Sequence, residues 1–294
     1  MKALIVENAY IKNSSQISQA ERIEQELKNF GVEVVVKKNF NLAQIKDNDV
    51  YLDGKYDFCV YLDKDKSAAR LLEMAGIRLF NCAQAVEICD NKMLTHIALS
   101  GHGINMPDSI YAPLCYYADA LPDDNFLQTV IKRLGLPLIA KTSYGSLGAG
   151  VYLIKDMQSL YAFERKNLLI EHFYQRFIDC GKGEDIRVIV VGGKTVCAMK
   201  RTNEYDFRSN IELGGIGKKF EANNELKSLC ENVSKILKLD YCGIDVLIDK
   251  NGVPYICEVN SNAFFAAAEK VCQTNIARIY AEYMLMTIKN LQTR

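Results

Sequence analysis

The sequence predicts an α/β protein in which an N-terminal domain with a doubly wound parallel sheet is followed by antiparallel strand pairs. Two observations predict this fold class. Over residues 1–83, short apolar runs alternate with segments of helical pattern, as they do when crossover helices join parallel strands. Farther along, Gly192-Gly193 and Asn251-Gly252 each separate two apolar runs. Such dipeptides form the tight turns of antiparallel hairpins, because both residues tolerate a positive φ.

The composition excludes several classes of protein. The 294 residues are 49% hydrophobic and 24% charged, as in ordinary globular proteins, and 36 basic residues balance 36 acidic ones. No global field therefore favours nucleic acid or a membrane as a partner. No apolar run is long enough for a membrane span, and the first residues turn polar too early for a signal peptide. The ten cysteines form no C-x-x-C pair, so we expect reduced thiols of a cytoplasmic protein and no zinc site.

The first domain is expected to end near residue 83. Gly31 and Gly76 each follow a helical segment and stop it, because glycine readily takes the left-handed conformation. The domain carries no glycine-rich phosphate loop, so we expect it to form a wall of a substrate cleft and not the nucleotide site. The expected strands are 3–6, 32–36, 58–62 and 77–80, and the expected helices are 17–30 and 67–75.

A lysine followed by a glycine-rich loop lies in the middle of the chain. The apolar run 135–141 is typical of a strand and ends in Lys141, whose ammonium must be aimed at something negative. The small residues at 142–150 expose backbone N–H groups that can wrap phosphate oxygens. The order of residues is not that of a P-loop, and a flexible hairpin loop is the alternative. A helix expected over 85–100 carries Lys92, which by itself is most simply a solvated lysine.

Polar residues also interrupt the strand-like run 168–174 and the hairpin 184–201. In the first, Glu171-His172 indicates either an edge strand or a segment whose backbone pairs with the edge of an adenine. In the second, pairing the residues on either side of the glycine turn puts Asp185 opposite Lys200, with Arg187 on the same face. These charges form either a structural ion-pair ladder or part of a binding site.

The hairpin near the C-terminus places three oxygen-bearing side chains where buried strands should be apolar. They are Asp245, Glu258 and Asn260. Depending on whether its turn has four residues or two, Asp245 lies opposite Ile256 or opposite Glu258. Both registers put the three side chains on one face, within roughly 5–8 Å of one another. A hard divalent cation, Mg²⁺ or Mn²⁺, would offset the two carboxylates. The alternative is a half-exposed hairpin whose acids face water.

Taken in order, these segments resemble the ATP-grasp enzymes, and most of all the RimK-type branch of ATP-dependent glutamate and amino-acid ligases. The similarity extends from about Ala85 to Leu291. Its most specific pieces are the runs Asp185-Ile-Arg187, Phe207-Arg-Ser-Asn210 and Glu258-Val-Asn260. His172 departs from the family pattern, because relatives usually have an acid there. Asn262 and Phe264-Phe265 replace a common Pro-Gly, which could reshape the substrate pocket.

The resemblance implies an α+β ATP-grasp fold of an N-terminal domain (1–83), a central lobe with a glycine-rich lid (84–167) and a C-terminal lobe with a metal site (168–294). ATP is sandwiched between the two lobes. One or two Mg²⁺ (or Mn²⁺) ions are held by Asp245, Glu258 and Asn260. Arg208 and Asn210 face a reacting acyl phosphate, with Lys141 as a further catalytic group. The nucleotide-binding candidates are Lys92, Lys141, Gly145, Ser146, Gly148, Glu171, His172, Phe173, Tyr174, Asp185 and Lys200.

The activity that the resemblance implies is ATP-dependent ligation of a carboxylate to an amine through an acyl phosphate. Within this class we expect the addition of glutamate or another amino acid to a peptide, a protein or a small metabolite. Two alternatives are a nucleotide-binding regulatory protein without turnover and an ATP-grasp kinase. We also expect a homo-oligomer, either a dimer or a tetramer, because relatives often assemble in that way.

Overall fold

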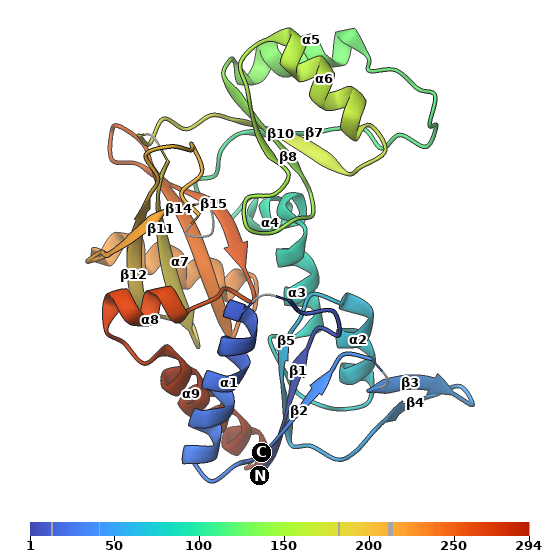
Figure 1. Ribbon diagram of the computed structural model, residues 1–294, viewed down its shortest axis with the longest axis vertical. Helices are drawn as coiled ribbons and strands as arrows, with labels where there is room; N and C mark the ends of the chain where they lie inside the picture. Colours follow the sequence, from blue (N-terminus) through green and yellow to red (C-terminus); the bar gives the residue numbers. More distant parts are fainter. Residues whose placement is uncertain (13, 41, 182, 211–213, 294) are drawn as a thin grey trace.

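The computed structural model describes residues 1–12, 14–40, 42–181, 183–210 and 214–293. Figure 1 shows three parts: the N-terminal domain at the end where both termini lie, the C-terminal lobe beside it, and the central lobe at the opposite end. The mixed α/β architecture, with a parallel sheet first and antiparallel sheets after it, confirms the predicted fold class. None of the described helices combines the length and apolar character needed to cross a bilayer.

The N-terminal domain is built on a four-stranded parallel sheet in the order β2-β1-β5-β6. Helix α1 packs with one side of the sheet and α2 with the other, so that the central strands are fully buried. The fourth strand is shorter than expected, and an unanticipated hairpin, β3-β4, follows β2. The elements are β1 (Lys2–Glu7), α1 (Ser14–Asn29), β2 (Glu33–Lys38), β3 (Ala43–Lys46), β4 (Asp49–Leu52), β5 (Phe58–Leu62), α2 (Lys66–Met74) and β6 (Leu79–Phe80).

The prediction of a single helix over 85–100 is wrong, because two helices, α3 (Ala83–Asp90) and α4 (Lys92–Leu99), occupy this stretch. Asn91 lies between them in an extended conformation, with φ −97° and ψ 109°. Its side chain accepts hydrogen bonds from the backbone N–H groups of Met93 and Leu94, each at 3.0 Å. An asparagine in this position caps the second helix and ends the first. The break places Lys92 in the first turn of α4.

The central lobe is a four-stranded antiparallel sheet in the order β7-β10-β8-β9. Helices α5 and α6 cover one face and enclose a small apolar core around Leu127, Leu138, Leu160 and Tyr174. The opposite face is turned to the C-terminal lobe. The elements are β7 (Ser109–Tyr111), α5 (Asp124–Leu134), β8 (Leu138–Thr142), β9 (Val151–Ile154), α6 (Met157–Asn167) and β10 (His172–Arg176).

The C-terminal lobe is a five-stranded antiparallel sheet in the order β13-β12-β11-β14-β15. Helix α7 packs on one face against Val188, Val190, Ile244 and Val246, which are fully buried. The other face carries charged residues of both hairpins, among them Asp185, Arg187 and Asp245. The elements are β11 (Glu184–Val191), β12 (Lys194–Thr202), β13 (Ile216–Lys219), α7 (Asn224–Ile236), β14 (Tyr241–Ile248), β15 (Pro254–Asn260) and α8 (Ala266–Cys272).

The last helix, α9 (Ile276–Gln292), leaves the C-terminal lobe and lies beside α1 (Figure 1). Its residues Tyr280 and Met284 belong to the same apolar cluster as Ile23 and Leu27 of α1. The same cluster includes Ile189 and Tyr241 of the C-terminal lobe, so α9 packs between the two parts and contributes to the core of both.

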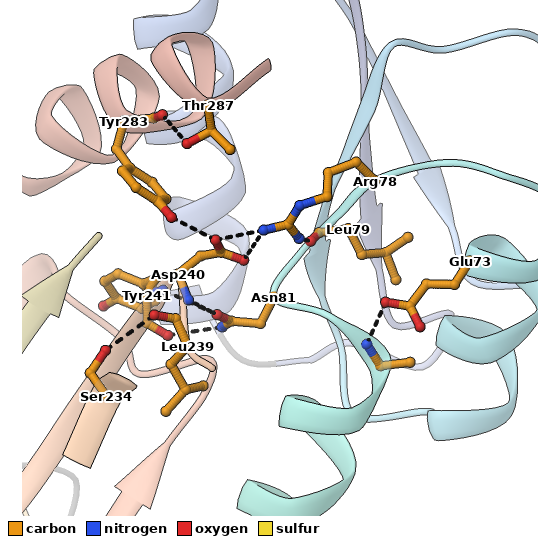
Figure 2. Close-up of polar contacts among 11 residues, drawn as sticks. Glu73, Arg78, Leu79, Asn81, Ser234, Leu239, Asp240, Tyr241, Tyr283 and Thr287 are labelled. Atoms are coloured by element: carbon orange, nitrogen blue, oxygen red, sulfur yellow. Dashed lines mark hydrogen bonds and ion pairs between the residues drawn. The ribbon is translucent and has the colours of Figure 1, made fainter. Parts of the chain in front are cut away.

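A polar lock joins the N-terminal domain to the C-terminal lobe (Figure 2). The Asn81 amide donates to the carbonyls of Tyr241 (2.8 Å) and Ser261 (2.7 Å), and its oxygen accepts from the N–H groups of Asp240 (2.6 Å) and Tyr241 (3.1 Å). Beside it, Arg78 holds both oxygens of Asp240 at 2.7 and 2.9 Å. Because Asn81 is 2% exposed, it satisfies four backbone groups that water does not reach.

We expect Asn81→Ala to destabilise the protein, because the buried backbone groups would lose their partners. A loss of about 2 kcal/mol corresponds to a fall of about 3 °C in the midpoint of thermal unfolding for a chain of this size. Thermal unfolding monitored by circular dichroism measures it. The control is Asn290→Ala on the exposed side of α9, which should unfold as the wild type does. Equal midpoints for the two variants would contradict the role of Asn81.

Candidate active site

A cleft of about 690 Å³ lies where the three parts of the chain meet. Two of its walls are the facing sheets of the central and C-terminal lobes, and the third is the carboxyl edge of the N-terminal sheet. Loops at the carboxyl ends of parallel strands are a common place for ligands in α/β folds. The residues that this edge contributes are Asn8, Tyr10, Ile11, Lys12, Ser15, Gln16, Asp63 and Lys64.

The central-lobe wall follows from the alternation of side chains along its strands. Ile139 and Lys141 of β8 point to the cleft, while Ala140 between them lies in the core under α5 and α6. Gln175 of β10 is the cross-strand partner of Ile139 and lines the cleft with it. Lys141 is 5% exposed, and its Nζ lies 3.6 Å from Cys257 Sγ on the facing sheet. Within the described ranges no carboxylate forms an ion pair with Lys141, and a buried ammonium of this kind is suited to an anionic ligand.

The glycine-rich loop between β8 and β9 is held by three cations, one from each part of the chain. Lys92 donates to the Gly145 carbonyl (2.7 Å), Lys64 to the Ser146 hydroxyl (3.2 Å) and Arg208 to the Gly148 carbonyl (2.8 Å). Burial lowers the pKa of Lys92, although Glu258 raises it. All three of these loop residues line the cleft.

The loop that carries Arg208 and Asn210 also reaches the cleft. Both residues line it, and Arg208 forms a two-point ion pair with Asp206, at 3.0 and 2.7 Å. The hydrogen bond that Arg208 donates to this carboxylate raises the pKa of Arg208. Residues 211–213, which belong to the same loop, lie outside the described residues.

The C-terminal wall brings together Asp245, Glu258 and Asn260 on one face. Asp245 pairs directly with Glu258, and Asn260 pairs with Gly243, two residues before Asp245. The shared face confirms the expected geometry. The turn, however, has neither of the two lengths that were expected, four residues or two. The connection from Ile248 to Pro254 has an odd number of residues, and a bulge between Asp245 and Val246 restores the register.

A buried charge network occupies the middle of this wall. Arg201 donates to Asp185 through Nε at 2.7 Å and also through its terminal nitrogen, which lies 3.0 Å from Asp245. Arg187, directly across from Asp245, holds it through Nε and a terminal nitrogen, the latter at 2.8 Å. Gly243 leaves room for this arginine, since a Cβ there would lie 3.0 Å from Arg187 Cδ. The four groups form an alternating chain of opposite charges.

The arginines control how the two carboxyl groups ionise. Burial alone would raise the pKa of Asp245, but Arg187 and Arg201 outweigh it and hold the pKa below its usual range. Burial raises the pKa of Asp185, which is only partly offset by Arg201. Asp245 is therefore the group held most firmly as a carboxylate at neutral pH.

The donor set fits a hard divalent cation, with the greater share falling on Glu258 and Asn260. Among the described residues, no side chain donates a hydrogen bond to the Glu258 carboxylate or the Asn260 amide oxygen. Asp245 already accepts from two guanidinium groups, so that it has fewer lone pairs to offer. Two carboxylates and one amide match the oxygen ligands of Mg²⁺ or Mn²⁺. No cluster of three His, Cys, Asp or Glu side chains suited to a metal occurs in the described part of the chain.

The prediction that Lys200 lies opposite Asp185, on the face of the binding site, is wrong. A bulge between Ile189 and Val190 shifts the hairpin register, so that Asp185 lies opposite Arg201 and Lys200 lies opposite Ile186. Lys200 thus falls on the face that packs under α7, pairs with Glu184 at 2.8 Å and does not line the cleft. The residue that the sequence analysis missed is its neighbour, Arg201. A bulge is the only signal that distinguishes the two, and a single sequence does not reveal it.

The structure does not bring Glu171, His172, Phe173 and Tyr174 to the cleft. Strand β10 is paired on both edges, with β7 and with β8, so that its backbone has no free edge there. His172 Nε2 lies 2.7 Å from the Glu164 carboxylate, which also accepts from the Tyr174 hydroxyl, and Glu171 accepts from Asn91 at 2.7 Å. The residues that do line the cleft follow directly in the sequence, at 175–178. The apolar pair Phe177-Ile178, directly after the strand, is the sequence feature from which this part of the cleft wall could have been predicted.

Comparison with solved structures shows the ATP-grasp fold. The D-alanine–D-alanine ligase of Bacillus anthracis complexed with ATP matches with a TM-score of 0.74, at 20% identity, over 100% of this chain and 99% of that one. The family model described as the RimK-like ATP-grasp domain matches residues 89–284. The chain belongs to the RimK-like ATP-grasp family.

Curated relatives agree with this assignment. Human N-acetylaspartylglutamate synthase A is 34% identical over 239 residues, which cover 80% of this chain and 59% of that protein. A probable α-L-glutamate ligase of Vibrio atlanticus is 33% identical over 226 residues, 74% of this chain and 70% of the relative. The chain thus spans little more than half the length of the human enzyme.

We expect Arg201→Met to be strongly destabilising, because it leaves two buried carboxylates to share one guanidinium. A cost of about 3–5 kcal/mol corresponds to a fall of about 5–8 °C in the unfolding midpoint. Differential scanning calorimetry provides the measurement. Arg278→Met removes an exposed arginine paired with Glu282 and should shift the midpoint by much less, since surface pairs contribute about 0–1 kcal/mol. Similar shifts in both variants would argue against the network.

Proposed function

We propose that the protein is an ATP-dependent carboxylate–amine ligase that adds glutamate to a carboxylate-bearing acceptor. The observation that carries this proposal is one cleft in which Lys92, Lys141 and a glycine-rich lid face the oxygen set of Glu258 and Asn260. A triphosphate needs cations and backbone donors on one side and metal ligands on the other. The names of the relatives, N-acetylaspartylglutamate synthase A and probable α-L-glutamate ligase, support glutamate as one substrate.

The cleft suggests a pose for the nucleotide. The base would lie against the apolar wall of Ile139, Phe177 and Ile178, and the phosphates would extend toward Lys141 and the lid. Glu258, Asn260 and the remaining lone pairs of Asp245 would hold one or two Mg²⁺ (or Mn²⁺) ions. When bound, the metal neutralises charge on the β- and γ-phosphates. In this pose, 175–178 takes the adenine-hinge role that the sequence analysis gave to Glu171–Tyr174.

The chain's own residues would then act at each step. Lys141 and Lys92 hold the phosphates so that a substrate carboxylate oxygen can attack the γ-phosphorus, with ADP as the leaving group. Arg208 and Asn210 stand beside the resulting acyl phosphate, where a guanidinium fork stabilises the developing oxyanion. The amine of glutamate attacks the carbonyl carbon, phosphate leaves and an amide forms. The lid, held from three sides, excludes water from the acyl phosphate.

The activity is tested by a phosphate-release screen. The protein is incubated with ATP, Mg²⁺ and glutamate, and with amino acids, N-acylated amino acids and short acidic peptides as partners. A ligase yields ADP, phosphate and a product whose mass is the sum of both substrates less one water. A kinase would instead yield a stable phosphorylated product without the amine, and a regulatory protein would bind nucleotide without turnover.

Cytoplasmic location and assembly as a dimer or tetramer remain predictions.

We expect Glu258→Gln to lower MgATP turnover by about a hundredfold or more while leaving the fold intact, because a neutral amide neutralises less of the metal's charge. Steady-state phosphate release measures turnover, and circular dichroism monitors the fold. Glu282→Gln on the exposed side of α9 is the matched control. Turnover at the wild-type level in Glu258→Gln would refute the metal assignment.

A further inference from the structure

A buried amide lies at the base end of the cleft and is held by two residues to which no role has been given. Gln175 of β10 is 2% exposed and lines the cleft. Ser109 is its cross-strand neighbour on β7, and His96 reaches it from α4. The three side chains therefore connect three separate elements at one point of the cleft wall.

The hydrogen bonds determine which way the amide is turned. The Ser109 hydroxyl donates its single hydrogen to the Pro107 carbonyl at 2.9 Å, so that its oxygen can only accept from Gln175. Gln175 Nε2 lies 3.0 Å from that oxygen and 3.2 Å from His96 Nε2. A turned amide would set its oxygen against the Ser109 oxygen, with no hydrogen between them.

His96 completes this arrangement. Its Nε2 lies 3.2 Å from Gln175 Nε2 and 3.5 Å from the Cys257 carbonyl oxygen. The shorter contact is a hydrogen bond when Nε2 accepts the second amide hydrogen, which requires a neutral ring with its hydrogen on Nδ1. Burial lowers the pKa of His96 to about 4, in agreement with a neutral ring at pH 7. Both hydrogens of the Gln175 amide are thus used within the protein.

The amide oxygen of Gln175 is left for a ligand. Across the described ranges, no group donates to Oε1, and this atom is not among the fully buried side-chain atoms without a partner. It therefore opens on the cleft, beside the apolar residues Ile139 and Phe177. A buried acceptor of this kind favours a ligand that brings an N–H group and disfavours one that brings an oxygen.

We propose that His96 and Ser109 are positioning residues that hold the Gln175 oxygen toward the cleft, where it accepts from the 6-amino group of adenine and rejects a 6-oxo purine. This inference rests on the proposed nucleotide site. It gives a physical origin for base selection in a residue pair that touches no nucleotide. In the absence of either residue, the amide could turn and present its NH₂ group, which suits an oxo group instead.

The test compares ADP with inosine diphosphate, in which an oxo group replaces the 6-amino group. Isothermal titration calorimetry with Mg²⁺ measures both dissociation constants on the full chain. For the wild type we expect ADP to bind at least about tenfold more tightly, since an unpaired buried acceptor costs about 1–3 kcal/mol. His96→Leu and Ser109→Ala should each reduce this ratio severalfold, and Ser109→Thr, which keeps the hydroxyl, should restore it. His102→Leu, at an exposed histidine, should leave it unchanged.

Equal binding of the two nucleotides to the wild type would overturn the inference while leaving the ligase proposal intact. An unchanged ratio in both His96→Leu and Ser109→Ala would overturn the positioning role. Failure of the wild type to bind either nucleotide would overturn the proposed function itself. If His96→Leu does not fold, the wild-type ratio and the Ser109 variants still decide, because a purely structural loss would weaken both nucleotides equally and leave the ratio unchanged.

Discussion

The cleft depends on the pairing of two guanidinium groups with two carboxylates on the C-terminal sheet. Asp185 and Asp245 are buried beside each other, and without Arg187 and Arg201 between them neither could remain ionised at an acceptable cost. The network is neutral as a whole. Glu258 therefore faces the central lobe with a negative charge of its own, across from Lys92. The cleft thus has a negative side on the C-terminal sheet and a positive side on the central lobe.

The sequence was sufficient to predict that three oxygen-bearing side chains of the last hairpin share one face, although the turn that joins its strands was not predicted correctly. Asp245, Glu258 and Asn260 share a face because an odd connection and a one-residue bulge cancel each other. In the preceding hairpin a bulge has no such compensation, and it exchanges Lys200 for Arg201. Bulges are stabilised by tertiary packing, which local sequence patterns do not encode. The alternation of side chains therefore predicts which residues share a face of a regular strand, and the prediction fails where the strand contains a bulge.

The fold was predicted more fully than the site, because strand and helix patterns are repeated signals and a binding wall depends on single residues. The alternation of the first domain was correct, but one capping residue, Asn91, divided a helix that looked continuous. The segment expected to contact adenine does not line the cleft, since Phe173 and Tyr174 resemble ligand residues by composition but are buried in the core. Contacts between domains, such as that of Lys64 with the lid, carried no sequence signal.

The pairing of α9 with α1 has a consequence for how the chain is made. Ribosomes release the N-terminal domain first, yet the apolar cluster that α1 joins includes Tyr280 and Met284, which emerge much later. Until then α1 exposes the surface that α9 will cover, and the nascent domain cannot reach its final stability. A chaperone or the rest of the nascent chain would have to shield that surface during synthesis. Synthesis of α9, and not the folding of any one domain, is then the event that commits these parts of the molecule to their mature form.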